Sequence, residues 1–224
     1  NKQDVHNVQK ILDEKNSHIK IIAKIENQQG VDNIDDILGS VYGIMVARGD
    51  LGVEIEAEKI PVIQRMLIKK CRERKKPVII ATQMLHTMIE HPRATRAEIS
   101  DVANAIYQRT DAIMLSGETA YGMYPLEAVE TMSKIAIEIE QNLQPDTNIQ
   151  LNHVTEPVTA TLSISAVEAT NKLPIKAIVI DTLSGRTGRY IATYRPAVHV
   201  FAKFYKSNHL PKLALSYGLY ASML

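Results

Sequence analysis

The stretch Gly43–Gly52, G-I-M-V-A-R-G-D-L-G, places a short apolar run directly before a polar cluster that begins at Arg48. A run without polar positions is typical of a strand that is covered on both faces, as in parallel sheets. Gly49 and Gly52 place Asp50 in a loop, where backbone N–H groups can approach an anion closely. The stretch therefore predicts a buried parallel strand over Gly43–Ala47 that ends in a ligand-binding loop.

The same order of apolar run and polar cluster occurs three more times between residues 19 and 119. Strands are expected over residues 19–26, 78–82 and 112–115, and they end in three clusters: Lys24 with Glu26, Thr82 with Gln83, and Ser116–Thr119 with Glu118. Helical patterns separate the strands, which indicates a parallel sheet. The carboxyl ends of parallel strands meet at one rim, so we expect all four clusters to contribute to one site.

Two of the intervening helices have clear start signals, the capping box T-R-A-E over residues 95–98 and a first-turn proline at Pro125. Spacings of three and four predict their inward-facing residues. These are Ile99, Val102, Ala103 and Ile106 in the first helix, and Leu126, Val129, Met132, Ala136 and Ile139 in the second.

The pattern lapses between Asn142 and Pro157 into a polar stretch with two prolines. We therefore expect an α/β protein with three parts: the C-terminal half of a TIM (β/α)8 barrel over residues 1–145, a linker over 146–156, and a smaller, truncated α/β domain over 157–224. In the last part we expect a helix over 158–173, strands over 177–180 and 198–202, a loop over 181–187, and a further helix after the second strand. The chain begins inside an amphipathic pattern and stops inside an apolar run, so we expect a fragment.

Composition argues against several classes of protein. The 224 residues include 26 basic and 25 acidic side chains, mixed along the chain, for a net charge of +1. This balance gives no sign of a nucleic-acid-binding arm or a membrane-attracting stretch. No apolar run approaches the ~20 residues that span a bilayer, and no signal-type leader is visible. The single Cys71 is expected to be a structural thiol, and a cytoplasmic protein is expected.

Lys24 and Glu26 are two residues apart on a strand, so both side chains point to the same face. Asp50 can bring a second carboxylate near Glu26, and two carboxylates with room for water and substrate oxygens suit a magnesium ion. A lysine beside such an ion is what phosphoryl transfer requires, because negative charge builds on the transferred group. An internal ion pair, with Asp50 as a plain turn residue, is the structural alternative.

Other chemistries have weaker support. The seven histidines, at positions 6, 18, 86, 91, 153, 199 and 209, show no metal-ligand spacing. Ser116 lacks the elbow pattern of a serine hydrolase, and no Walker or dinucleotide fingerprint is present. The segment Thr182–Thr187, with Ser184, Gly185 and Arg186, lies between a strand and a helix and could hold a phosphate group. An ordinary capped turn explains this segment nearly as well.

Five segments in order resemble the pyruvate kinase family: I-I-A-K-I-E-N from Ile21, V-A-R-G-D-L-G-V-E from Val46, A-T-Q-M-L from Ala81, A-T-R-A-E from Ala94 and M-L-S-G-E-T-A from Met114. The family usually has proline where this chain has Ala94. The resemblance implies the later half of the catalytic barrel followed by most of the C-terminal effector domain.

The resemblance also implies residue roles. Lys24 would stabilise the phosphoryl group in flight, and Glu26 and Asp50 would hold magnesium or manganese. Gly49 and Asp50, through their backbone, and the Thr82 hydroxyl would bind the carboxylate of phosphoenolpyruvate or pyruvate. Arg48, Ser116 and Glu118 would support the site. The segment Thr182–Thr187 resembles the family's sugar-phosphate effector loop.

The same resemblance implies ADP and ATP as the other substrates, and a homotetramer as the full-length form. The upstream half-barrel, its potassium site and the lid domain that closes over the nucleotide have no counterpart in these residues. Without them the isolated 224-residue chain is expected to be inactive and prone to aggregate. Two alternatives to a pyruvate kinase stay open, a metal-dependent aldolase of the phosphoenolpyruvate and pyruvate barrel group, and a free-standing sugar-phosphate sensor.

Overall fold

The computed structural model describes residues 1–152, 154–206, 210–211 and 213–224. It divides into two compact units, Asn1–Cys71 with Lys76–Ile139 and Arg72–Lys75 with Glu140–Leu224. Each unit is an α/β structure built on its own parallel sheet. His153 and His209 lie outside the described residues, so the expectation for these two histidines stays a prediction.

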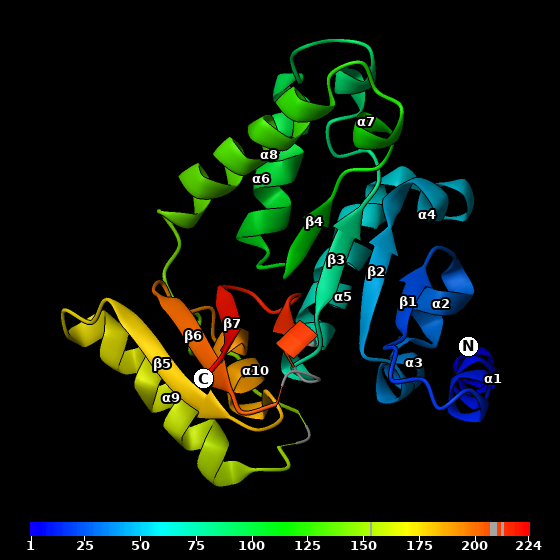
Figure 1. The fold of residues 1–224 in the computed structure, drawn as a ribbon. Coiled ribbons are helices and arrows are strands. Elements are labelled where there is room, and N and C mark those ends of the chain that lie inside the picture. Colours follow the sequence, from blue (N-terminus) through cyan, green and yellow to red (C-terminus); the bar gives the residue numbers. More distant parts are fainter. Residues whose placement is uncertain (153, 207–209, 212) are drawn as a thin grey trace. The chain divides into compact units, whose positions relative to one another are not determined.

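The sheet of the first unit has four parallel strands, β1 (Ile22–Ile25), β2 (Gly43–Ala47), β3 (Val78–Ala81) and β4 (Ala112–Met114). Their order in the sheet is the same as their order in the chain (Figure 1). All four strands were predicted, and β2 has the predicted bounds. Because all neighbouring strands are parallel, their carboxyl ends form one continuous edge.

Helices precede, connect and follow these strands: α1 (Lys2–Glu14), α2 (Gln28–Asp32), α3 (Ile34–Ser40), α4 (Arg48–Glu54), α5 (Ile60–Glu73), α6 (Arg96–Tyr107), α7 (Gly117–Ala120) and α8 (Pro125–Glu140). Two short 3-10 helices cover Ala57–Lys59 and His86–Ile89. The predicted capping box of α6 is present, with Thr95 as N-cap and Glu98 returning the contact. Helix α8 begins at Pro125 as predicted.

Three of the predicted inward-facing residues are exposed. Leu126 and Val129 of α8 are 66% and 50% exposed, because the buried face of this helix is set by Ala128 and Met132. At 100° per residue, Leu126 lies about 200° around the helix from Ala128. Ile99 is 40% exposed, whereas Val102, Ala105 and Ile106 form the buried face of α6.

The core of the first sheet is close-packed around β2. Ile44, Val46 and Ala47 are fully buried, as expected for a strand covered on both faces. Gly43 is required at the start of β2, since a Cβ atom there would lie 2.5 Å from the Pro77 carbonyl oxygen. This close approach holds β2 against the residue that precedes β3.

The second unit has helix α9 (Pro157–Lys172), strand β5 (Ala177–Thr182), helix α10 (Arg186–Thr193), and strands β6 (His199–Phe204) and β7 (Leu219–Met223). The sheet is parallel in the order β5-β6-β7 (Figure 1). Val167 of α9 and Ile191 of α10 join Val200, Phe204 and Leu219 in one buried cluster. Both helices therefore cover the sheet through the same core.

Two predictions for this unit were wrong. The loop expected over 181–187 is shorter, because β5 continues through Thr182 and α10 begins at Arg186. The helix expected after β6 is not formed by the described residues of 205–218, which show turns and short 3-10 segments. The apolar run that follows them is instead β7, which pairs with β6 and places Leu219 in the core.

Across the described residues, no helix combines the length and apolar character needed to cross a membrane.

Candidate active site

The first polar cluster joins two neighbouring strand ends through one ammonium group. Lys24 Nζ lies 2.5 Å from Glu26 Oε2 and 2.6 Å from Asp50 Oδ2. Lys24 is on β1, Glu26 follows that strand directly, and Asp50 lies beyond the end of β2. All three side chains are about half exposed, whereas Ile25 between the first two is buried. The alternation of a strand thus brings the lysine and Glu26 to the same open face.

The two carboxylates keep Lys24 charged. Hydrogen bonds with Asp50 first and Glu26 second raise the pKa of Lys24 above its usual value. The lysine is therefore an ammonium ion throughout the neutral range. A fixed positive charge at a strand end is suited to a ligand on which negative charge develops.

The prediction that Asp50 lies in a loop is wrong. Asp50 lies in the first turn of the short helix α4. The glycines at 49 and 52 do not prevent this helix, because a two-turn segment needs little intrinsic helix propensity once Leu51 is buried against the core. The backbone N–H of Gly49 donates to Thr82 Oγ1 over 2.8 Å. This bond ties the start of α4 to the end of β3.

Thr82 and Gln83 both adopt left-handed backbone conformations, with φ of 68° and 54°. A β-branched residue is rare in this region, and each such residue costs roughly 1–3 kcal/mol and persists only where its surroundings enforce the conformation. The turn brings the Thr82 hydroxyl back over the strand end, where it donates to the Ala81 carbonyl over 2.6 Å while accepting from Gly49. Nothing in the sequence letters A-T-Q indicates this backbone.

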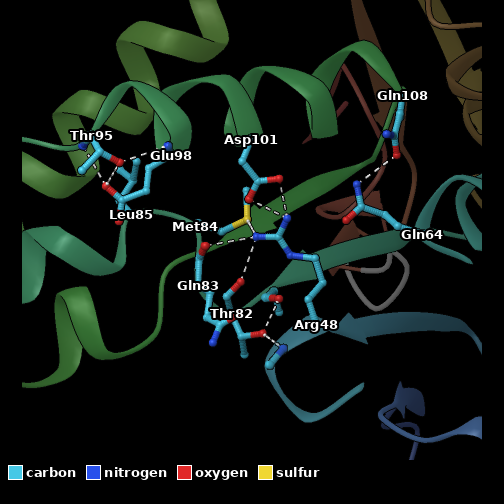
Figure 2. A network of polar contacts seen from close by, with 12 residues as sticks. Arg48, Gln64, Thr82, Gln83, Met84, Leu85, Thr95, Glu98, Asp101 and Gln108 are labelled. Carbon is cyan, nitrogen blue, oxygen red and sulfur yellow. Dashed lines mark hydrogen bonds and ion pairs between the residues drawn. The ribbon is translucent and has the colours of Figure 1, made fainter. Parts of the chain in front are cut away.

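Arg48 is nearly buried, and its guanidinium group contacts the backbone of the Thr82–Gln83 turn (Figure 2). Its Nη2 donates to the Thr82 carbonyl over 2.9 Å and to the Gln83 carbonyl over 3.2 Å, and lies 2.8 Å from Met84 Sδ. Its Nη1 pairs with Asp101 of α6 at 2.6 and 2.7 Å. Asp101 was missed by the sequence analysis, because no spacing rule connects a residue on this helix with a residue after β2.

Glu118 connects the ends of β3 and β4 from a buried position. One carboxylate oxygen accepts from the Leu85 N–H over 3.0 Å, and the other accepts from the Ser116 N–H over 2.8 Å. Its side chain is 2% exposed, so it is not available to a ligand in this arrangement. Glu118 and Ser116 thus shape the rim through backbone contacts.

The two carboxylates fit a divalent cation in donor type and reach. Glu26 Oε2 and Asp50 Oδ2 both lie within 2.6 Å of one nitrogen, so they are at most about 5 Å apart. Oxygens on opposite sides of a magnesium ion are about 4 Å apart. Within the described part of the chain, no group of three or more His, Cys, Asp or Glu side chains could hold a metal ion. A cation at this pair would therefore need further oxygens from water or a ligand.

The polar residues after β5 form a smaller, local arrangement. Gly185 has a left-handed backbone, with φ of 78°, and its N–H donates to Thr182 Oγ1 over 3.0 Å. Helix α10 begins at the next residue, and Arg186 pairs with Glu156, the N-cap of α9. Ser184 and Thr187 are partly buried in this turn.

A parallel sheet whose consecutive strand ends carry a lysine, two carboxylates and a hydroxyl defines a (β/α)-barrel type of protein with its site at the carboxyl rim. The model of the family "Pyruvate kinase, barrel domain" matches residues 1–129, and that of "Pyruvate kinase, alpha/beta domain" matches residues 160–224. The chain belongs to the pyruvate kinase family, so the resemblance seen in the sequence is confirmed.

Individual relatives agree with this assignment. The chain is 50% identical over 232 residues to a pyruvate kinase of Borreliella burgdorferi, covering 99% of this chain and 47% of the relative. It is also 50% identical to a pyruvate kinase of Geobacillus stearothermophilus, covering 97% of this chain and 38% of the relative. The crystal structure of a pyruvate kinase from Cryptosporidium parvum superposes with a TM-score of 0.92 at 40% identity, covering all of this chain and 48% of that one. The chain thus spans about two fifths to one half of the length of these relatives.

Proposed function

We propose that this chain provides part of the active site of a pyruvate kinase, which transfers the phosphoryl group of phosphoenolpyruvate to ADP. The observation that carries the proposal is the contact of Lys24 with both Glu26 and Asp50 across two strand ends. A single ion pair at the end of β1 would need only Glu26. The approach of a second carboxylate from the first turn of α4, directly after β2, gives a site with one ammonium group and two metal-binding groups on one open face.

Each residue has a role that its position supports. Lys24 meets the charge that develops on the phosphoryl oxygens, and Glu26 and Asp50 hold a magnesium or manganese ion. A divalent cation held by these two carboxylates would supply positive charge that offsets the negative charge of the substrate. The N–H groups at the start of α4 and the Thr82 hydroxyl bind the substrate carboxylate. The Gly49 N–H donates to Thr82 Oγ1 over 2.8 Å and that hydroxyl donates to the Ala81 carbonyl, so the two groups lie at one point and would exchange these bonds for bonds to the carboxylate.

The test is turnover by the full-length polypeptide that carries this chain. Pyruvate formation from phosphoenolpyruvate should require both ADP and a divalent cation, and one ATP should form for each pyruvate. Pyruvate release without ADP, or carbon–carbon cleavage of a longer substrate, would contradict the proposal. That second outcome would support the aldolase, which the matches with pyruvate kinases do not favour.

Family membership supports three further proposals for the full-length polypeptide. We infer that it requires potassium, that it is a homotetramer, and that the segment Thr182–Thr187 binds the phosphate of a sugar-phosphate effector. The last inference also rests on the start of α10 directly after the left-handed Gly185, because the first N–H groups of a helix have no partner within it and can bind an anion. Omitting potassium from the assay tests the first proposal, and light scattering of the purified protein tests the second.

A further inference from the structure

A buried arginine connects helix α6 to the backbone of the Thr82–Gln83 turn. The Arg48 side chain is 9% exposed, and its two terminal nitrogens are divided between two tasks (Figure 2). Nη1 binds both carboxylate oxygens of Asp101, and Nη2 binds the carbonyls of Thr82 and Gln83. The planar guanidinium fixes the direction of one set of bonds once the other is made.

The turn that Arg48 holds would not keep its shape by itself. Thr82 and Gln83 are consecutive residues without glycine's freedom, and both have positive φ. Two carbonyls that point toward one cation are favoured only while the cation stays in place. Asp101 supplies the negative charge that keeps the guanidinium there. Arg48 Nε is buried without a hydrogen-bond partner among the described residues, so the two terminal nitrogens make the polar contacts that hold this side chain.

We propose that Asp101 is a positioning residue for the substrate-carboxylate site. Through Arg48 it holds Thr82 and Gln83 in their left-handed conformation, and this sets the Thr82 hydroxyl against the Gly49 N–H. The proposal rests on the proposed function for the identity of the ligand, although the effect on the backbone can be measured without any ligand. In the alternative, Asp101 only anchors α6 to Arg48. That role would need the salt bridge, but it would not depend on the conformation of Thr82 and Gln83.

The test compares Asp101→Ala, Asp101→Asn and a glycine rescue in the full-length polypeptide. Asp101→Ala should raise KM for phosphoenolpyruvate by about tenfold or more, because a charge-assisted contact that orients a binding group is lost. The change in kcat and in Mn²⁺ affinity should be less than about threefold, since the contacts of Lys24, Glu26 and Asp50 do not involve α6. Asp101→Asn retains one acceptor and should give an intermediate KM.

The rescue separates a positioning role from a purely structural one. Gln83 is exposed, and glycine adopts positive φ without strain. Adding Gln83→Gly to Asp101→Ala should therefore lower KM again by about threefold or more, because the turn then needs less support. Gln108→Ala is the matched control. It removes the 2.9 Å bond that Gln64 donates to Gln108, the C-cap residue of α6, and should leave KM unchanged.

Hydrogen exchange of the free protein gives an independent readout. The Gly49 amide should exchange faster in Asp101→Ala than in the wild-type protein, because its acceptor on Thr82 becomes mobile. Unchanged Gly49 exchange together with an unchanged KM would overturn the proposal. A loss of kcat that is equal in Asp101→Ala and Asp101→Asn, and that Gln83→Gly does not restore, would overturn the proposal as well. That result would favour a purely structural role for Asp101. Failure of the proposed function is a different result, namely no turnover by the wild-type protein.

Discussion

The ends of β1–β4 and the end of β5 are built from similar sequences, a parallel strand, a polar cluster and a helix, yet their contacts differ. In the first unit the contacts join clusters that are distant in the chain, as between Lys24 and Asp50, 26 residues apart, or Gly49 and Thr82, 33 residues apart. After β5, Gly185 contacts Thr182 only three residues away, and a longer contact joins Arg186 to Glu156 at the N-cap of α9 and not to another strand end. Convergence of several strand ends is evidence for a site, whereas contacts within one turn and with one helix cap are explained equally well by the capping of α9 and α10.

The comparison predicts that substitutions at the convergent rim have the larger effects. Lys24→Ala should lower kcat of the full-length polypeptide by on the order of 10²-fold or more, because the ammonium charge is needed mainly in the transition state. The measurement is steady-state pyruvate formation at saturating substrates.

The matched control is Lys20→Ala, which removes an exposed lysine just before β1. Near wild-type turnover is expected for it. If the Lys24 variant turned over as fast as the Lys20 variant, the rim would be a structural ion-pair cluster.

A smaller effect is expected at the local arrangement after β5. Arg186→Ala should weaken the binding of a sugar phosphate by about tenfold, as for the loss of one charge-assisted hydrogen bond. Calorimetry with a sugar bisphosphate is the measurement. Lys172→Ala is the control, because Lys172 lies at the far end of α9 from Glu156, the partner of Arg186. If both variants bound the sugar phosphate as tightly as the wild type, the effector-site proposal would be contradicted, and this turn would be an ordinary capped helix start.

The smallest effect is expected for the capping box of α6, a local contact within the first unit. Thr95→Ala should lower the free energy of unfolding by about 1 kcal/mol with little change in kcat. Urea unfolding at pH 7 measures the free energy of unfolding, and steady-state pyruvate formation measures kcat. A loss of turnover without a loss of stability would show that this box contributes to the rim directly.

The same box predicts a pH dependence. Burial acts to raise the pKa of Glu98, but hydrogen bonds from Thr87 and Thr95 outweigh it, and the folded-state pKa lies below the usual 4.5. The charged carboxylate therefore stabilises the fold above pH 4.5, and this contribution is lost as the pH falls through the folded-state value. The stability difference between wild type and Glu98→Gln should be constant at neutral pH and shrink as the pH falls below 4.5, and a difference independent of pH would contradict the assignment.

The sequence predicted what depends on short-range pattern and on chain order. Apolar runs located the strands, and T-R-A-E located the start of α6. The order β1-β2-β3-β4 made the rim predictable, since strands that are consecutive in the chain are neighbours in the sheet. The alternation of one strand was enough to place Lys24 and Glu26 on the same face and Ile25 on the other.

What the sequence did not predict depends on tertiary contacts. The left-handed conformation of Thr82 and Gln83 opposes the preference of both residues, and it depends on Arg48, which is 34 residues from Thr82. Asp101, the partner of Arg48, lies 53 residues after the arginine in the chain. The face of α8 is set by what packs on Ala128 and Met132, and the extension of β5 by its pairing with β6.

The central claim is that Glu26 and Asp50 share one divalent cation beside Lys24, and a manganese titration of the full-length polypeptide tests it most directly. Glu26→Gln and Asp50→Asn should each weaken Mn²⁺ binding, and the double variant should be weaker by less than the product of the two effects, because both residues act on one ion. Glu58→Gln, a change at an exposed carboxylate on the 3-10 helix after α4, should leave the affinity unchanged. Wild-type affinity in both single variants, or fully independent effects in the double variant, would contradict a shared ion.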